Sequence, residues 1–140
     1  MSGRVPWARA AEIFLRVALA ASFLSAVADR FGLWGSPGAP GVAWGAWGPF
    51  VDYTATINPL VPTGMVPALA WTATLAEVAI ALGLLVGWRL RWFAAAGGAL
   101  LSLFAFAMAT SVGLKPPLDY SVFSVAAAAF VLACSPRARA

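Results

Sequence analysis

The stretch from Val66 to Trp88 limits the possible folds of this chain more than any other. It reads VPALAWTATLAEVAIALGLLVGW, with one carboxylate, Glu77, near the middle. As a helix rising about 1.5 Å per residue, this length crosses the roughly 30 Å hydrocarbon core of a bilayer. A charge at the membrane centre costs about 2.5–3.5 kcal/mol on insertion scales, so an acidic residue there normally has an ion-pair partner or a functional role. We therefore expect Glu77 to be important, with Arg16 as its ion-pair partner.

The composition supports a membrane protein with one domain over residues 1–140. Hydrophobic residues make up 62% of the chain and charged residues only 10%, whereas a soluble domain has roughly 25% charged residues. Mean hydropathy is +0.87. The net charge of +4 does not indicate nucleic-acid binding, because the charges are few and stand at segment ends rather than on one basic face. The expected partner is the lipid bilayer.

The residues that are missing exclude several kinds of site. The chain has no histidine, so we expect no histidine-ligated haem, no histidine-containing zinc site and no histidine general base. Its single cysteine, Cys134, cannot form an internal disulfide or a dithiol redox pair. We interpret Cys134 as a passive apolar residue or an acylation target. No metal, no haem and no catalytic residue is predicted.

The hydropathy predicts an all-α, four-helix transmembrane bundle with a long outer loop. The four expected spans are residues 10–28, 66–88, 92–113 and 119–134. The loop begins with an irregular Gly- and Pro-rich part, and residues 47–60 then show helical spacing typical of a short interfacial helix. Lys115-Pro116-Pro117 is expected to form a tight non-helical connection, and Asp119 to be the N-cap of the fourth span.

The first span also has features of a signal peptide. A basic start and an apolar run precede Ala26-Val27-Ala28, which has the small-x-small form of a cleavage site. Glu12 and Arg16 interrupt that apolar run, and three further spans follow it. These features favour a retained first helix.

The distribution of basic residues predicts the orientation. With four spans, one side carries six arginines and the other carries two basic residues: Arg4, Arg9, Arg89, Arg91, Arg137 and Arg139 against Arg30 and Lys115. Because Lys and Arg favour cytoplasmic ends, we expect both termini in the cytoplasm and the long loop outside.

Two groups of polar residues are candidate sites. The first is Glu12, Arg16 and Glu77, read either as a buried ion pair that fixes helix register or as a site that binds a headgroup or relays a proton. Glu12 and Arg16 lie one turn apart and can pair along one helix. The second group is an outer cluster, read as ordinary helix-end polarity or as the mouth of a ligand site. It contains Asp29, Asp52, Lys115, Asp119 and Tyr120, together with Arg30, Thr110 and Ser111.

Several segments resemble the DoxX family of small bacterial membrane proteins. They are FLRVALAASFLSAVADRFGLWG, WGPFVDYTATINPLVP, LAWTATLAEVAIALGLLVG and LKPPLDYSVFSVAAAAF, in an order that covers about residues 12–133. The resemblance implies a four-helix fold in the bacterial inner membrane. It also implies membrane subunits that accompany thiosulfate:quinone oxidoreductase, oxidant-defence or thiol-redox proteins. Arg16 and Glu77 fall where the family tends to keep charged residues.

Three functions remain open at this level. The first is a quinone- or lipid-binding membrane subunit with a redox partner subunit, because the chain lacks a complete redox centre of its own. The second is a small proton-coupled transporter that uses Glu77. The third is a structural membrane protein without a ligand. A homo-oligomer is compatible with each of them.

Overall fold

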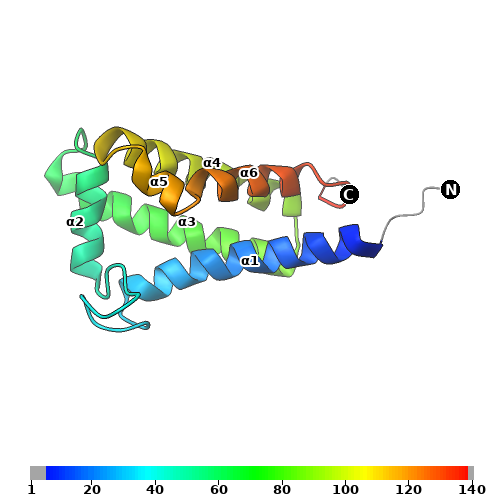
Figure 1. Cartoon of the computed structure of the whole chain (residues 1–140), viewed down its shortest axis with the longest axis horizontal. Coiled ribbons are helices and arrows are strands. Elements are labelled where there is room, and N and C mark those ends of the chain that lie inside the picture. The colour runs from blue at the N-terminus through cyan, green and yellow to red at the C-terminus, as the bar shows by residue number, and fades with distance from the viewer. Residues whose placement is uncertain (1–5, 139–140) are drawn as a thin grey trace.

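A computed structural model describes residues 6–138 of the chain, and these residues form helices and loops with no β-strand (Figure 1). The elements are α1 (Pro6–Arg30), α2 (Trp47–Ile57), a single 3₁₀ turn η1 (Thr63–Met65), α3 (Val66–Val86), α4 (Leu90–Ser111), α5 (Lys115–Asp119) and α6 (Val122–Ala133). The all-helical class is as predicted. Arg4 and Arg139, which contributed to the predicted orientation, lie outside the described residues.

Three of the helices are long and apolar enough to cross a membrane. They are α1 with 25 residues, η1 joined to α3 with 24, and α4 with 22. Helix α6 is apolar but has only 12 residues. Helix α1 is longer than the predicted span of 10–28, because it starts at Pro6 and includes Asp29 and Arg30 in its last turn.

Two predictions about the connection after α4 are wrong. Lys115-Pro116-Pro117 does not form a non-helical link but starts the short helix α5, because proline is well tolerated in the first turn, where its missing N–H has no partner to lose. Asp119 ends α5 and does not cap the next helix. The N-cap of α6 is Ser121, which has a φ of 55° and makes no side-chain capping hydrogen bond.

The helices pack as two antiparallel pairs. Helix α1 lies along α3, and α4 lies along α6, while α2 crosses one end of the bundle and contacts α3 and α4 (Figure 1). The start of α1 and the end of α6 lie at the opposite end from α2 (Figure 1).

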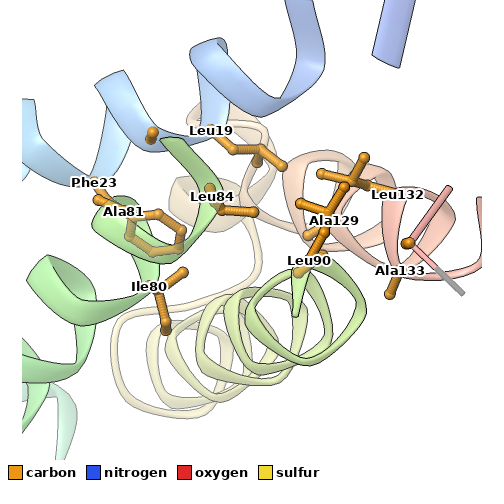
Figure 2. Close-up of a cluster of buried hydrophobic side chains, with 12 residues drawn as sticks. Leu19, Phe23, Ile80, Ala81, Leu84, Leu90, Ala129, Leu132 and Ala133 are labelled. Atoms are coloured by element: carbon orange, nitrogen blue, oxygen red, sulfur yellow. The ribbon is translucent and has the colours of Figure 1, made fainter. Parts of the chain in front are cut away.

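A hydrophobic core joins the two pairs near the end of the bundle that is far from α2. Leu19, Leu84 and Leu132 bring three helices together there, and each is at most 2% exposed (Figure 2). Small residues allow the close approach: a Cβ on Gly98 would lie 2.9 Å from the Phe130 ring. This packing holds the bundle closed at one end and leaves the half near α2 less filled.

Candidate functional site

A cavity of about 710 Å³ lies between the helix pairs, on the side of the bundle nearer α2. Most of its wall is apolar and comes from α1, α2, α3, α4 and α6; representative lining residues are Phe23, Ala76, Leu100, Phe104, Met108 and Val125. Arg30 and Glu77 are the charged side chains among its lining residues in the described part of the chain. An apolar cavity with a few convergent polar groups is the usual form of a small-molecule site.

Arg30 and Glu77 form a buried ion pair in the wall of this cavity. Nη1 of Arg30 contacts Oε2 of Glu77, and the two side chains are 2% and 3% exposed. The same Nη1 donates a hydrogen bond of 2.7 Å to Oγ1 of Thr74, one turn before Glu77 on α3. Helix α1 places Arg30 at its last residue, from where the side chain runs inward along α3. Burial of this kind is tolerated only because the opposite charges are in contact.

Aromatic rings from α2 and the loop before it cover the guanidinium of Arg30. The Phe50 ring centroid is 3.9 Å from the Arg30 Cζ, and the Trp44 ring centroid is 5.5 Å from it. Such cation–π contacts stabilise a cation that has lost its water. Phe50 and Trp44 in turn pack edge to face, with ring centroids 5.0 Å apart.

Two polar atoms of the ion pair lack a hydrogen-bond partner. They are Nε of Arg30 and Oε2 of Glu77, each with less than 1 Å² of accessible surface. Oε2 is nevertheless in ion-pair contact with Nη1 of Arg30. Unpaired buried groups of this kind are rare and need an explanation.

Asp29, next to Arg30, fixes the loop that carries Trp44. Its carboxylate accepts three backbone N–H bonds, from Ala43 at 2.9 Å, Trp44 at 2.8 Å and Gly45 at 2.9 Å. The loop must come very close here, since a Cβ on Gly45 would overlap the backbone of Pro37. Asp29 is 7% exposed, so this member of the predicted outer cluster is an internal anchor.

The predicted pairing of Arg16 with Glu77 is wrong. Arg16 donates from Nε to the Leu84 carbonyl at 3.0 Å and from Nη2 to the Leu85 carbonyl at 3.2 Å. The last carbonyls of a helix have no partner within it, so the C-terminal end of α3 offers Arg16 an alternative to the carboxylate. Gly87, the C-cap of α3, has a φ of 77°, and a Cβ there would meet the Arg16 guanidinium.

Glu12 also has a different partner from the one expected. Its Oε2 lies 3.7 Å from Nη1 of Arg137, so it connects the start of α1 to the tail after α6 instead of pairing with Arg16. The structure therefore separates Glu12, Arg16 and Glu77. Glu77 lines the cavity, and the other two lie outside its lining.

The remaining members of the outer cluster stay apart from the ion pair. Lys115 and Asp119 form an exposed pair one turn apart on α5, and Tyr120 is 74% exposed. Asp52 is exposed on α2.

Ser111 donates a 2.9 Å hydrogen bond to the Ile57 carbonyl and so connects the end of α4 to α2. Thr110, on the last turn of α4, lines the cavity.

Tyr53, on α2, lines the cavity beside Thr54 and Asn58. Burial, with a smaller contribution from the nearby Tyr120, raises the pKa of the Tyr53 phenol above its ordinary value of 10.0. Tyr53, Phe50 and Trp44 are not among the site residues predicted from the sequence. The available signal was the helical spacing of residues 47–60, which indicates a buried face on α2.

Among residues 6–138, no three His, Cys, Asp or Glu side chains gather as a metal site requires. No protein-family model, no curated protein and no solved structure matches this chain. The assignment of function therefore depends on the cavity and its ion pair.

Proposed function

We propose that this protein is a membrane subunit that binds a lipid-soluble ligand, a quinone or a lipid, in the cavity that Arg30 and Glu77 line. The observation that carries this proposal is the cavity of about 710 Å³ with an apolar wall and a buried ion pair. This volume lies within the roughly 300–1,000 Å³ of typical small-molecule sites. The headgroup would lie at the ion pair, and the apolar tail along the lining residues of α1, α3 and α4.

The openings of the cavity favour a ligand that arrives through the bilayer. Four exposed lining residues stand on the flanks of the long helices, away from their ends: Ser22 on α1, Thr72 on α3, and Leu103 and Phe106 on α4. A fifth, Thr110, stands on the last turn of α4. In a membrane these flanks face hydrocarbon. A lipid-soluble molecule could therefore enter sideways, whereas a water-soluble one would have to cross the aromatic cover near α2.

A quinone is one ligand that suits this cavity and its ion pair. Its ring would lie against the apolar wall, and a carbonyl would accept a hydrogen bond from the guanidinium of Arg30, which lines the cavity. When bound, a quinone supplies two-electron redox chemistry, while this chain binds and orients it. Together with the resemblance to DoxX, this favours a role beside a redox partner subunit in oxidant defence.

We also propose that α6 is a fourth span and that both termini, at the end of the bundle opposite α2, face the cytoplasm of a bacterial inner membrane. Arg9, Arg89, Arg91 and Arg137 stand at that end, as the preference of basic residues for the cytoplasmic side requires. Cys134, exposed just after α6, allows a direct test. An impermeant maleimide should leave it unlabelled in intact cells and label it in inverted vesicles; the reverse result would contradict this topology.

The binding proposal is tested by purifying the protein in mild detergent and identifying the lipids and quinones that copurify. Ala76→Phe should reduce the bound species, because Ala76 lines the cavity. Ala79→Phe is the matched control, since Ala79 lies on the exposed side of the same helix. If both variants retain the same bound species as the unaltered protein, or if nothing binds in any of them, the cavity is not a ligand site.

A small proton-coupled transporter is the second candidate. The specific observation in its favour is that Glu77 lines the cavity and stands in the middle of a helix long and apolar enough to cross a membrane. Carboxylates within such helices often carry protons in transporters. Flux into liposomes that disappears with Glu77→Gln and persists with Glu12→Gln would support it. Flux that is equal in both variants would exclude it.

A further inference from the structure

Resting on the proposed membrane placement but not on the cavity, we infer that the turn between α3 and α4 binds the headgroup of an anionic phospholipid. The turn, residues 88–92, reads WRLRW and lies at the end of the bundle opposite α2 (Figure 1). Its central residue, Leu90, is buried and belongs to the core with Leu84 and Leu132 (Figure 2). The other residues of the turn are exposed. One buried leucine therefore fixes two arginines and two tryptophans at the surface.

Arg89 and Arg91 are cations without an acidic partner among residues 6–138. The ion pairs in this part of the chain are Arg30–Glu77, Lys115–Asp119 and Arg137–Glu12. The remaining acidic residues are Asp29, which binds the loop before α2, and Asp52, which is exposed on α2 at the other end of the bundle. Two guanidinium groups with no counter-charge attract an anion, and their planar N–H groups match the oxygens of a phosphate.

Arg16 removes a source of repulsion beside the turn. The turn directly follows the C-terminal end of α3, where free carbonyls carry a partial negative charge. Arg16 donates to the carbonyls of Leu84 and Leu85, and a Cβ on Gly87 would meet the same guanidinium. Arg16 therefore offsets the negative end of the helix and adds a positive charge at the start of the turn.

The two tryptophans of the turn favour a lipid over a soluble anion. Cζ of Arg89 lies 5.3 Å from the ring centroid of Trp88, and Cζ of Arg91 lies 5.6 Å from the ring centroid of Trp92. The two indoles are 63% and 64% exposed. Because exposed indoles of membrane proteins lie at the level of the lipid headgroups, each guanidinium is held at the depth of the lipid phosphates.

Apolar side chains of α3 continue from the turn towards the middle of the helix. Leu82, Leu85 and Val86, in the last turns of α3, are all exposed. They offer the acyl chains of a bound lipid a surface beside its headgroup, and a soluble phosphate would leave this surface unused.

The backbone of Arg89 is strained. Its φ of 45° lies in the left-handed region, which disfavours any side chain and which glycine adopts freely. Strained residues of this kind cluster at functional sites. The strain also supplies a useful variant, because Arg89→Gly removes the cation and relaxes the backbone at the same time.

The test compares phosphatidylglycerol with phosphatidylcholine of the same acyl chains. Both lipids have a phosphate, but the ammonium of choline offsets its charge. Binding to the full-length protein in neutral detergent is measured by native mass spectrometry. Phosphatidylglycerol should bind at least about tenfold more tightly, because each arginine near a lipid phosphate contributes roughly fivefold. Glycerol phosphate at the same concentration should not displace the bound lipid.

Variants locate the preference. Arg89→Gln combined with Arg91→Gln should remove it, whereas Arg9→Gln combined with Lys115→Gln, which removes two exposed cations outside the turn, should keep it. Arg89→Gly should weaken the preference roughly fivefold without lowering the temperature of unfolding, because glycine adopts this φ without strain. Ala76→Phe, which fills the cavity, should leave the preference unchanged.

Several outcomes would overturn the inference. They are equal binding of the two phospholipids, displacement by glycerol phosphate, and a preference that survives the double glutamine variant of the turn. An equal loss in the control pair would mean that net charge, and not the turn, selects the lipid. A loss with Ala76→Phe would place the anionic lipid in the cavity instead. Because the cavity variant and the turn variants are read in the same assay, failure of this lipid site and failure of the proposed cavity function are distinguishable.

Discussion

The guanidinium of Arg30 lies against the carboxylate of Glu77, although Arg30 is the last residue of α1 and Glu77 lies in the middle of α3. The contact joins one helix pair internally and stands in the wall of the cavity between the pairs.

Removing one partner of this ion pair should be much worse than removing both. Arg30→Met or Glu77→Met should each lower the free energy of unfolding by about 3–5 kcal/mol, because a buried charge is left alone. The double variant should be more stable than either single variant. Equilibrium unfolding in mixed detergent micelles measures all three, and a double variant that is the least stable would contradict a direct ion pair.

A double-mutant cycle distinguishes Arg30 from Arg16 as the partner of Glu77. Arg30→Met and Glu77→Met should show a coupling energy above about 1 kcal/mol, as expected for residues in contact. Arg16→Met and Glu77→Met should add within about 0.5 kcal/mol, because Arg16 bonds to the carbonyls of Leu84 and Leu85. Strong coupling in the second cycle would restore the pairing that the sequence suggested.

Asp29→Asn should loosen the loop without unfolding the helices. The amide retains one acceptor oxygen, whereas the carboxylate serves three backbone N–H groups, so the loss should be about 1–3 kcal/mol. Hydrogen exchange should become faster at Ala43, Trp44 and Gly45 and stay unchanged in α4. Asp52→Asn, an exposed change, is the control.

Gly45→Ala should cost more stability than Gly41→Ala. Both glycines have positive φ, 69° and 77°, so alanine at either position should lower the free energy of unfolding by about 1–2 kcal/mol through the left-handed conformation. A Cβ at Gly45 would in addition overlap the backbone of Ser36 and Pro37, whereas nothing lies within 4 Å of one at Gly41. Thermal unfolding of the two variants should therefore differ by roughly a further 1–3 kcal/mol; equal losses would mean that the loop does not close on Gly45.

The raised pKa of Tyr53 predicts a loss of stability at high pH. Above 10.0 the unfolded chain releases this proton while the folded protein still holds it, so stability falls as the pH rises from 10.0 towards the folded pKa. Below pH 10.0 both states hold the proton and Tyr53 has no effect. Absorbance of tyrosinate near 295 nm should show a late-titrating phenol that disappears in Tyr53→Phe; a phenol that titrates at or below 10.0 would contradict the burial of this side chain.

Local sequence was enough to predict the long helices. Long apolar segments can satisfy their backbone only as helices in lipid, so residues 66–88 and 92–113 predict α3 and α4 closely. The same reasoning identifies Glu77, because a carboxylate within such a segment has a high free energy of insertion whichever way its side chain is oriented. Ends of helices were less predictable: Asp119 was expected to cap the fourth span, yet it ends α5, and Ser121 is the N-cap of α6.

The order of residues alone defines an all-helical chain with helices long and apolar enough to cross a bilayer, and one acid, Glu77, that needs a partner. Which base meets that acid was decided by tertiary structure. Arg16 and Arg30 both lie on α1. Counting residues along α3 does not show which of these two long side chains extends to Glu77. The free carbonyls at the end of α3 bind Arg16, and the aromatic cover of Phe50 and Trp44 stabilises Arg30 beside Glu77. Both contacts join segments far apart in the chain, so no local pattern could predict them.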